Sequence, residues 1–85
     1  MKYTIFDIET NGLYQDVTKL HCLSYQIFED GILLSKNTLV DTELIKNFVE
    51  QQECIVGHNI IRYDLPVLEK LVGVKYSKKI IDTLA

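Results

Sequence analysis

Two carboxylates near the N-terminus are the first residues whose types and spacing indicate chemistry. Asp7 and Glu9 stand two positions apart within residues 3–12, an otherwise apolar and β-prone run. Side chains alternate between the two faces of a strand, so both carboxylates are expected on the same side. Like charges this close repel, and a hard divalent cation held by oxygen ligands relieves that repulsion. The alternative is a solvated strand end, because D-x-E is a common tripeptide.

A second group of polar residues follows a short apolar run at residues 54–58. It contains His58, Asn59, Tyr63 and Asp64, at the point where a strand is expected to give way to a helix. Ligands of α/β sheets gather at the carboxyl ends of strands, so Asp64 is a candidate third carboxylate for a divalent-ion site. The alternative is that Asp64 is a helix-start residue and Asn59 a turn residue.

The elements that must position these residues begin with a β-hairpin. Strands are expected over residues 2–9, 20–28 and 32–40, with Glu29-Asp30-Gly31 as the turn between the last two. Asp41 or Thr42 then supplies a helix N-cap, and apolar residues recur at helical spacing to about Gln52. The N-terminal half is therefore expected to be three strands and one short amphipathic helix.

The second half continues as strand, helix and strand. Residues 54–58 are expected as a buried strand, and the stripe of Leu65, Leu68 and Val72 predicts a helix with Pro66 in its first turn and Gly73 as its C-cap. Residues 79–84 are expected as a fifth strand. The order β-β-β-α-β-α-β indicates an α/β fold with a mixed five-stranded sheet.

Composition sets the class of protein. The 85 residues suffice for one domain, residues 1–85, and 47% of them are apolar with a single Pro, which predicts an ordered globular chain. No charged leader precedes an apolar run and no run approaches 18 apolar residues, so we expect a cytoplasmic protein without a membrane span. Cys22 and Cys54 lack a C-x-x-C partner and are expected to be reduced core thiols.

The formal net charge of −3 does not favour nucleic-acid binding by bulk attraction to phosphate. Bound divalent cations would offset the clustered acids, and the remaining charges can segregate. Four lysines gather toward the C-terminus: Lys70, Lys75, Lys78 and Lys79. This cluster is either a nucleic-acid contact or a solvated basic face.

Four segments of the chain, taken together and in order, carry a resemblance to a known family. They are Asp7-Ile8-Glu9, residues 17–22, His58-Asn59 with Tyr63-Asp64 and Pro66, and Ile81-Asp82-Thr83-Leu84. The set resembles the 3′-5′ proofreading exonuclease domain of podovirus-type phage DNA polymerases, within the DEDD exonuclease superfamily. The resemblance spans essentially the whole chain, and it implies a ribonuclease-H-like fold, truncated after strand 5.

The resemblance also implies roles for individual residues. Asp7, Glu9 and Asp64 match catalytic carboxylates that bind two Mg²⁺ or Mn²⁺ ions. Four residues match positions that contact the terminal nucleotides, namely Thr10, Leu13, Asn59 and Tyr63, with Leu13 as an apolar wedge beside the last base. Asp82 matches a supporting aspartate outside the metal ligands. His58 and His21 are expected to be structural.

The family's third motif supplies a fourth carboxylate and a residue that positions the attacking water, and residues 1–85 do not contain it. Two hypotheses follow. The chain is a fragment or split subunit of a metal-dependent 3′-5′ exonuclease, completed by a polymerase or a complementary exonuclease segment, or it is a catalytically impaired module that binds nucleic-acid ends or a protein. Its expected partner is a single-stranded 3′ end, DNA rather than RNA, in the host cytoplasm if the chain is phage-encoded. An uncovered apolar face near Ile80, Ile81 and Leu84 also predicts a homodimer.

Overall fold

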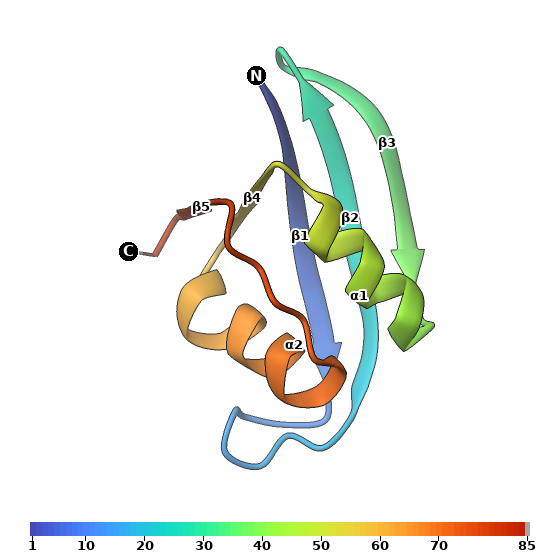
Figure 1. The fold of residues 1–85 in the computed structure, drawn as a ribbon, viewed down its shortest axis with the longest axis vertical. Helices are drawn as coiled ribbons and strands as arrows, with labels where there is room; N and C mark the ends of the chain where they lie inside the picture. The colour runs from blue at the N-terminus through green and yellow to red at the C-terminus, as the bar shows by residue number, and fades with distance from the viewer. Residues whose placement is uncertain (85) are drawn as a thin grey trace.

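The computed structural model describes residues 1–84 and contains five strands, two α-helices and one π-helical turn (Figure 1). In chain order the elements are β1 (Lys2–Thr10), β2 (Leu20–Glu29), β3 (Ile32–Leu39), α1 (Thr42–Gln51), β4 (Cys54–Gly57), η1 (Ile60–Asp64), α2 (Leu65–Val72) and β5 (Lys79–Asp82). The predicted order of strands and α-helices is confirmed. No helix in residues 1–84 is long and apolar enough to cross a membrane.

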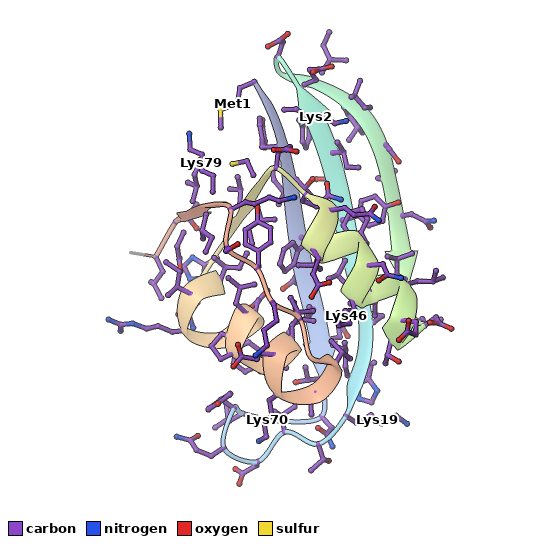
Figure 2. All side chains as sticks on the ribbon, in the orientation of Figure 1. Met1, Lys2, Lys19, Lys46, Lys70 and Lys79 are labelled. Atoms are coloured by element: carbon purple, nitrogen blue, oxygen red, sulfur yellow. The ribbon has the colours of Figure 1, made fainter. Side chains whose placement is uncertain are left out.

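The five strands form one mixed sheet in the order β3-β2-β1-β4-β5. The pairs β1–β2 and β2–β3 are antiparallel, whereas β1–β4 and β4–β5 are parallel. Lys2 and Lys79, which begin β1 and β5, therefore lie toward the same end of the sheet (Figure 2). The carboxyl ends of β1, β4 and β5 therefore all lie at the opposite end of the sheet.

One face of the sheet is covered by the helices, and the other is open. Along β1, Thr4, Phe6 and Ile8 are buried, and the residues between them are exposed. Phe6 and Ile8 join one hydrophobic cluster with residues from both α-helices, including Ile45, Val49, Val67 and Leu68. This alternation places the odd-numbered residues of β1 on the open face.

Local sequence signals account for most element boundaries. The Asp41 carboxylate accepts hydrogen bonds from the backbone N–H groups of Glu43 (2.9 Å) and Leu44 (3.1 Å), which makes it the predicted N-cap of α1. Gly73 ends α2 with a φ of 76°, a left-handed conformation that glycine adopts without strain. Asp30 and Gly31 turn the hairpin with φ values of 51° and 81°.

Three expectations from the sequence are corrected. The fifth strand ends at Asp82, because the Asp82 carboxylate accepts the N–H of Leu84 at 2.9 Å and turns the chain out of the sheet. Cys54 is buried as expected, but Cys22 lies on the open face opposite Glu9 and is only half-buried. Ile80 packs against the hydrophobic cluster, so the predicted apolar face retains only Ile81 and Leu84, which are exposed.

Candidate functional site

Asp7 and Glu9 lie on the open face of β1, near its carboxyl end. Asp7 pairs across the sheet with Ser24 of β2, and Glu9 pairs with Cys22. Both carboxylates are exposed, whereas the intervening Ile8 is buried on the helical side. The strand therefore presents the two acids side by side, as the alternation in the sequence predicts.

Asp64 contrasts with these two acids because it is buried. It is the last residue of η1, and only 5% of its surface is exposed. Burial, together with the negative charges of Asp7 and Asp82, raises the pKa of the Asp64 carboxyl to about 7. The fold thus brings Asp64 within electrostatic reach of Asp7, 57 positions earlier in the chain.

Asp64 lies at the start of α2, as the alternative interpretation expects, but its side chain does not cap the helix. Asp64 immediately precedes α2, its side chain makes no capping hydrogen bond, and its backbone is already helical with φ −58° and ψ −51°. A capping residue has an extended backbone and a side chain that accepts from the first turn. Helix capping therefore does not account for the Asp64 carboxylate.

Asp82 holds the start of η1 in place. Its Oδ1 accepts the backbone N–H of Asn59 at 3.0 Å, and its Oδ2 accepts that of Ile61 at 2.9 Å. Asn59 has the left-handed φ of 59°, so the chain turns sharply between β4 and η1. The Oδ1 atom of Asn59 is buried without a hydrogen-bond partner in the described residues. These two hydrogen bonds of the Asp82 carboxylate, called the Asp82 clamp below, hold the backbone at the start of the turn that carries Asn59 and Asp64.

Tyr63 of η1 contacts the loop that follows β1. Its hydroxyl is 2.6 Å from the Thr10 hydroxyl and donates to the Gly12 carbonyl at 2.7 Å. Thr10 also contacts the Gly12 carbonyl at 3.0 Å. Leu13 follows at once and is 71% exposed. The structure therefore groups three predicted substrate residues, Thr10, Leu13 and Tyr63, at one end of the molecule.

Two residues that stabilise this loop were not predicted from the sequence. The Asn11 side chain accepts the backbone N–H groups of Thr18 and Lys19, both at 3.1 Å, and donates to the Thr18 hydroxyl at 2.8 Å. Val17 is fully buried and anchors the loop in the core. The available signals were an Asn directly after a strand and a single aliphatic residue in a polar stretch.

The two histidines, which were expected to be structural, differ in their contacts. Nδ1 of His58 lies 3.3 Å from the Thr83 hydroxyl, a long hydrogen bond between the ends of β4 and β5. His21 is exposed on β2. Within residues 1–84, neither histidine forms an ion pair with Asp7, Glu9 or Asp64.

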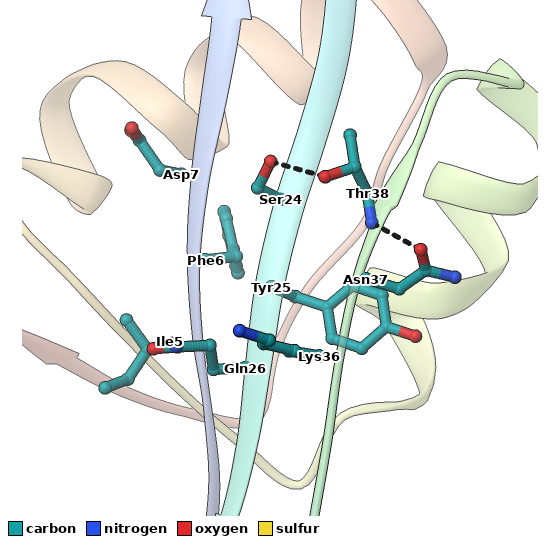
Figure 3. A pocket seen from close by; sticks show the side chains of 9 residues that line it. All are labelled: Ile5, Phe6, Asp7, Ser24, Tyr25, Gln26, Lys36, Asn37 and Thr38. Atoms are coloured by element: carbon teal, nitrogen blue, oxygen red, sulfur yellow. Dashed lines mark hydrogen bonds between the residues drawn. The ribbon is translucent and has the colours of Figure 1, made fainter. Parts of the chain in front are cut away.

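A groove lies on the open face beside Asp7. It has a volume of about 520 Å³, and its floor includes Ser24 of β2 and Thr38 of β3, whose hydroxyls are 2.9 Å apart (Figure 3). Ile5, Gln26 and Lys36 form the next row across the same three strands. The surface next to Asp7 is thus a shallow mixture of hydroxyl, amide and aliphatic groups.

The chemistry of the acids fits a divalent cation, but their arrangement in the protein alone does not close a ligand set. Within residues 1–84, no three His, Cys, Asp or Glu side chains are grouped closely enough to hold a metal ion. In the same residues, no lysine, arginine or histidine forms an ion pair with Asp7, Glu9 or Asp64. Hard oxygen donors that repel one another without a cationic partner are suitable ligands for Mg²⁺ or Mn²⁺.

Comparison with known families gives a match that covers nearly the whole chain. A sequence model described as the RNase H superfamily matches residues 4–85. The chain belongs to the RNase H superfamily. Its mixed five-stranded sheet with two α-helices agrees with that fold, and the superfamily assigns it a nuclease-type scaffold. A search of curated proteins gives no match.

Within an RNase H superfamily scaffold, the placement of the acids gains meaning. The nuclease-type fold implies a nucleic-acid substrate, and RNase H-like nucleases generally use divalent metal ions. In this chain Asp7, Glu9 and Asp64 come from the end of β1 and the end of η1, two segments brought together at one edge of the sheet. Asp82 lies at that edge as well, with its carboxylate engaged by backbone N–H groups.

Proposed function

We propose that this chain is the metal-binding part of a 3′-5′ exonuclease of the DNA proofreading type, acting on a single-stranded 3′ end. The observation that carries the proposal is the buried Asp64 carboxyl, which lies within electrostatic reach of Asp7, has a pKa raised to about 7 and forms no ion pair with a cationic side chain of residues 1–84. Keeping a carboxylate in that position costs stability, and functional sites are where such costs are found.

Asp7, Glu9 and Asp64 are the residues that would hold Mg²⁺ or Mn²⁺. A pair of such ions activates water and stabilises the departing oxygen in phosphodiester hydrolysis, without a protein nucleophile. Thr10, Leu13, Asn59 and Tyr63 would hold the terminal nucleotides. Asp82 would act as a positioning residue, because its hydrogen bonds are to the backbone of Asn59 and Ile61.

The proposal includes a partner for full activity. Residues 1–85 contain no counterpart of the fourth carboxylate and of the residue that positions water in the exonucleases that this chain resembles. A polymerase, a complementary exonuclease segment or a second copy of the chain would supply them. Loss of a positioned general base typically costs about 10² to 10⁴ in rate, so residues 1–85 alone should cleave slowly.

Two measurements test the proposal. Calorimetric titration with Mn²⁺ should show binding to the wild type and none to the double variant Asp7→Asn, Glu9→Gln, while Glu53→Gln, an exposed acid far along the chain, should bind normally. Slow shortening of a 5′-labelled single strand from its 3′ end should require Mn²⁺ and stop with EDTA. Equal binding heats from the wild type and the double variant would contradict the metal site.

A second candidate function is favoured by the absence of a closed ligand set in residues 1–84. In that case the chain binds nucleic-acid ends, or a polymerase or host protein, without cutting. The two functions separate in one assay, because a binding module would shift the anisotropy of a labelled single strand in Mn²⁺ and leave its length unchanged. Addition of a polymerase or of the missing exonuclease segment would restore cleavage only under the first proposal.

A further inference from the structure

The loop at residues 11–19 carries an aromatic ring that none of the roles above uses. Tyr14 follows Leu13 at the tip of the loop and is 42% exposed. Lys70 of α2 reaches it, with its ammonium group donating to the Tyr14 carbonyl at 3.0 Å and lying 5.2 Å from the centre of the Tyr14 ring. Figure 2 shows Lys70 where α2 meets this loop. The ring therefore keeps substantial accessible surface although a cation already lies near one side of it.

The loop backbone that carries Tyr14 is held by hydrogen bonds on both sides of that residue. Asn11 closes the base of the loop through its bonds to Thr18 and Lys19, and Tyr63 binds the Gly12 carbonyl. Within the loop, the N–H of Val17 donates to the Leu13 carbonyl at 2.7 Å. An aromatic side chain held in place loses little conformational entropy when a ligand stacks on it.

A groove of about 530 Å³ opens beside the ring. It runs along α2 to the segment before β5 and is lined by Tyr14, Ile61, Leu65, Pro66, Glu69, Lys70, Val74, Lys75 and Tyr76. Its one acid, Glu69, lies 3.6 Å from the ammonium group of Lys75. The lining thus has two aromatic rings and an excess of positive charge.

Positive charge gathers in the part of the sequence that supplies most of this groove. From Arg62 onward the sequence holds five of its nine basic residues and three of its twelve acidic ones. This part of the chain is therefore net positive, although the whole chain carries −3. A polyanion is the ligand that such a groove would attract.

We propose that Tyr14 and Lys70 form a subsite for an unpaired nucleobase and its adjoining phosphate, distinct from the residues expected to hold the terminal nucleotides. Aromatic platforms combined with cationic side chains are how proteins bind single strands without sequence preference. The inference rests on the proposed function for its substrate class, and it adds a contact to the strand on the α2 side of the loop. Lys70 has two roles here, since it holds the loop and places charge beside the ring.

The absence of Trp from the sequence gives a direct test. In a Tyr14→Trp variant the indole is the only Trp fluorophore, and stacking of a base on it quenches its emission. Titration with a short oligothymidylate in EDTA, which prevents cleavage, should give saturable quenching. The matched control is Tyr3→Trp, because Tyr3 stacks on Phe28 with ring centres 5.4 Å apart, near the opposite end of β1. Its emission should not change.

Affinities from the anisotropy of a labelled oligothymidylate complete the test. Tyr14→Ala should weaken binding about tenfold, while Tyr14→Phe should bind like the wild type because stacking does not need the hydroxyl. Lys70→Met, which keeps the aliphatic stem, should weaken binding and reduce its dependence on salt. Thermal melts of each variant show whether the fold is retained, and the quenching of Tyr14→Trp remains informative if Tyr14→Ala does not fold.

Several outcomes would overturn the subsite. Binding of oligothymidylate without quenching of Tyr14→Trp would exclude stacking there, and equal quenching by an oligoglutamate of the same charge would show attraction to a polyanion only. Failure of the wild type to bind any oligonucleotide would remove the subsite together with the substrate class. Normal quenching in a protein that binds no Mn²⁺ would keep the subsite and reject the proposed metal site, so the two failures are distinguishable.

Discussion

Two carboxylates lie at the two ends of η1, and they differ in their hydrogen bonds and burial. One belongs to Asp82 of β5 and the other to Asp64, the last residue of η1. At the start of the turn, Asp82 accepts hydrogen bonds from the backbone N–H groups of Asn59 and Ile61, and also from Leu84. At its end, Asp64 is buried with a pKa raised to about 7. Both acids lie at the same end of the sheet, and the negative charge of Asp82 helps to raise the pKa of Asp64.

This difference separates a structural acid from a functional one. A carboxylate that accepts several backbone N–H groups stabilises the turn that supplies them. A carboxyl that is buried near two other acids is destabilised in its charged form, and at Asp64 this outweighs the backbone hydrogen bond that favours the charge. The predictions below follow from this contrast, and substitutions at the two positions should have opposite signs.

The largest effect is expected at Asp82. Asp82→Ala removes the acceptor of three backbone N–H groups, so the free energy of unfolding should fall by about 2 to 4 kcal/mol. Urea denaturation followed by circular dichroism measures it. Asp16→Ala, at an exposed acid of the 11–19 loop, is the control and should cost less than about 0.5 kcal/mol. A similar loss from both variants would mean that Asp82 is not a clamp.

Asp64→Asn should raise the free energy of unfolding, whereas Asp82→Ala should lower it. The folded-state pKa of about 7 lies above the ordinary 3.8, so the folded protein holds a proton that the unfolded chain releases between these values. The stability of the wild type must therefore fall as the pH rises from about 4 to about 7, and then level off. At pH 8 in EDTA, Asp64→Asn should be more stable by about 2 kcal/mol, allowing for solvent screening.

The measurement for Asp64 is a pair of unfolding curves at each pH. At pH 8 the variant should melt several degrees above the wild type, because about 1 kcal/mol moves the melting temperature by roughly 4 to 8 °C in a domain of this size. At pH 4 the two proteins should converge. A destabilised Asp64→Asn at pH 8 would show that the carboxylate is stabilising and would remove the contrast with Asp82.

Divalent ions should offset the loss of stability that the charged Asp64 carboxylate causes. Mn²⁺ at ten times its dissociation constant should raise the stability of the wild type at pH 8 by about 1.4 kcal/mol, because it binds the folded chain. The gain should shrink at pH 5.5, where the Asp64 carboxyl is protonated and a proton must leave before the ion binds. Asp64→Asn should gain little at either pH. An equal gain in the variant would place the ion elsewhere.

Much of the fold could be predicted because its signals are local. Asp41 as N-cap, Gly73 as C-cap and the alternation around Asp7 each depend on residues within a few positions of one another. The π-helical turn could not be predicted this way. It depends on Asp82, which reaches back more than twenty positions to the N–H groups of Asn59 and Ile61.

The residues of the candidate site were named from the sequence, and their roles stay predictions. The sequence indicated Asp7, Glu9 and Asp64 as acids that share one site, while the RNase H superfamily match shows the nuclease-type fold that carries them. The burial of Asp64 depends on how η1 packs under the sheet edge, and the bond of Tyr63 to Thr10 spans 53 positions. Side-chain contacts over such separations leave no periodic signal in the sequence.

The smallest effect is expected at Thr83, beside Asp82. Its hydroxyl makes only long bonds, 3.3 Å to Nδ1 of His58 and 3.4 Å to the Gly57 carbonyl, and its backbone N–H to the same carbonyl at 3.0 Å does not depend on the side chain. Thr83→Val keeps the shape and removes the hydroxyl, so the cost should be about 0.5 kcal/mol.

A double-mutant cycle sharpens this last comparison. If Asp82 alone holds η1, the costs of Asp82→Asn and Thr83→Val should add within about 0.5 kcal/mol, because their hydrogen bonds share no partner atom. Urea denaturation of the wild type, the two single variants and the double variant gives the four free energies of unfolding, provided that the dependence on urea concentration has the same slope in all four. A coupling above 1 kcal/mol, or a single cost at Thr83 that rivals the cost at Asp82, would mean that the edge of β4 and β5 acts as one network. The contrast would then lie between that whole network and Asp64, whose ionisation is opposed by burial.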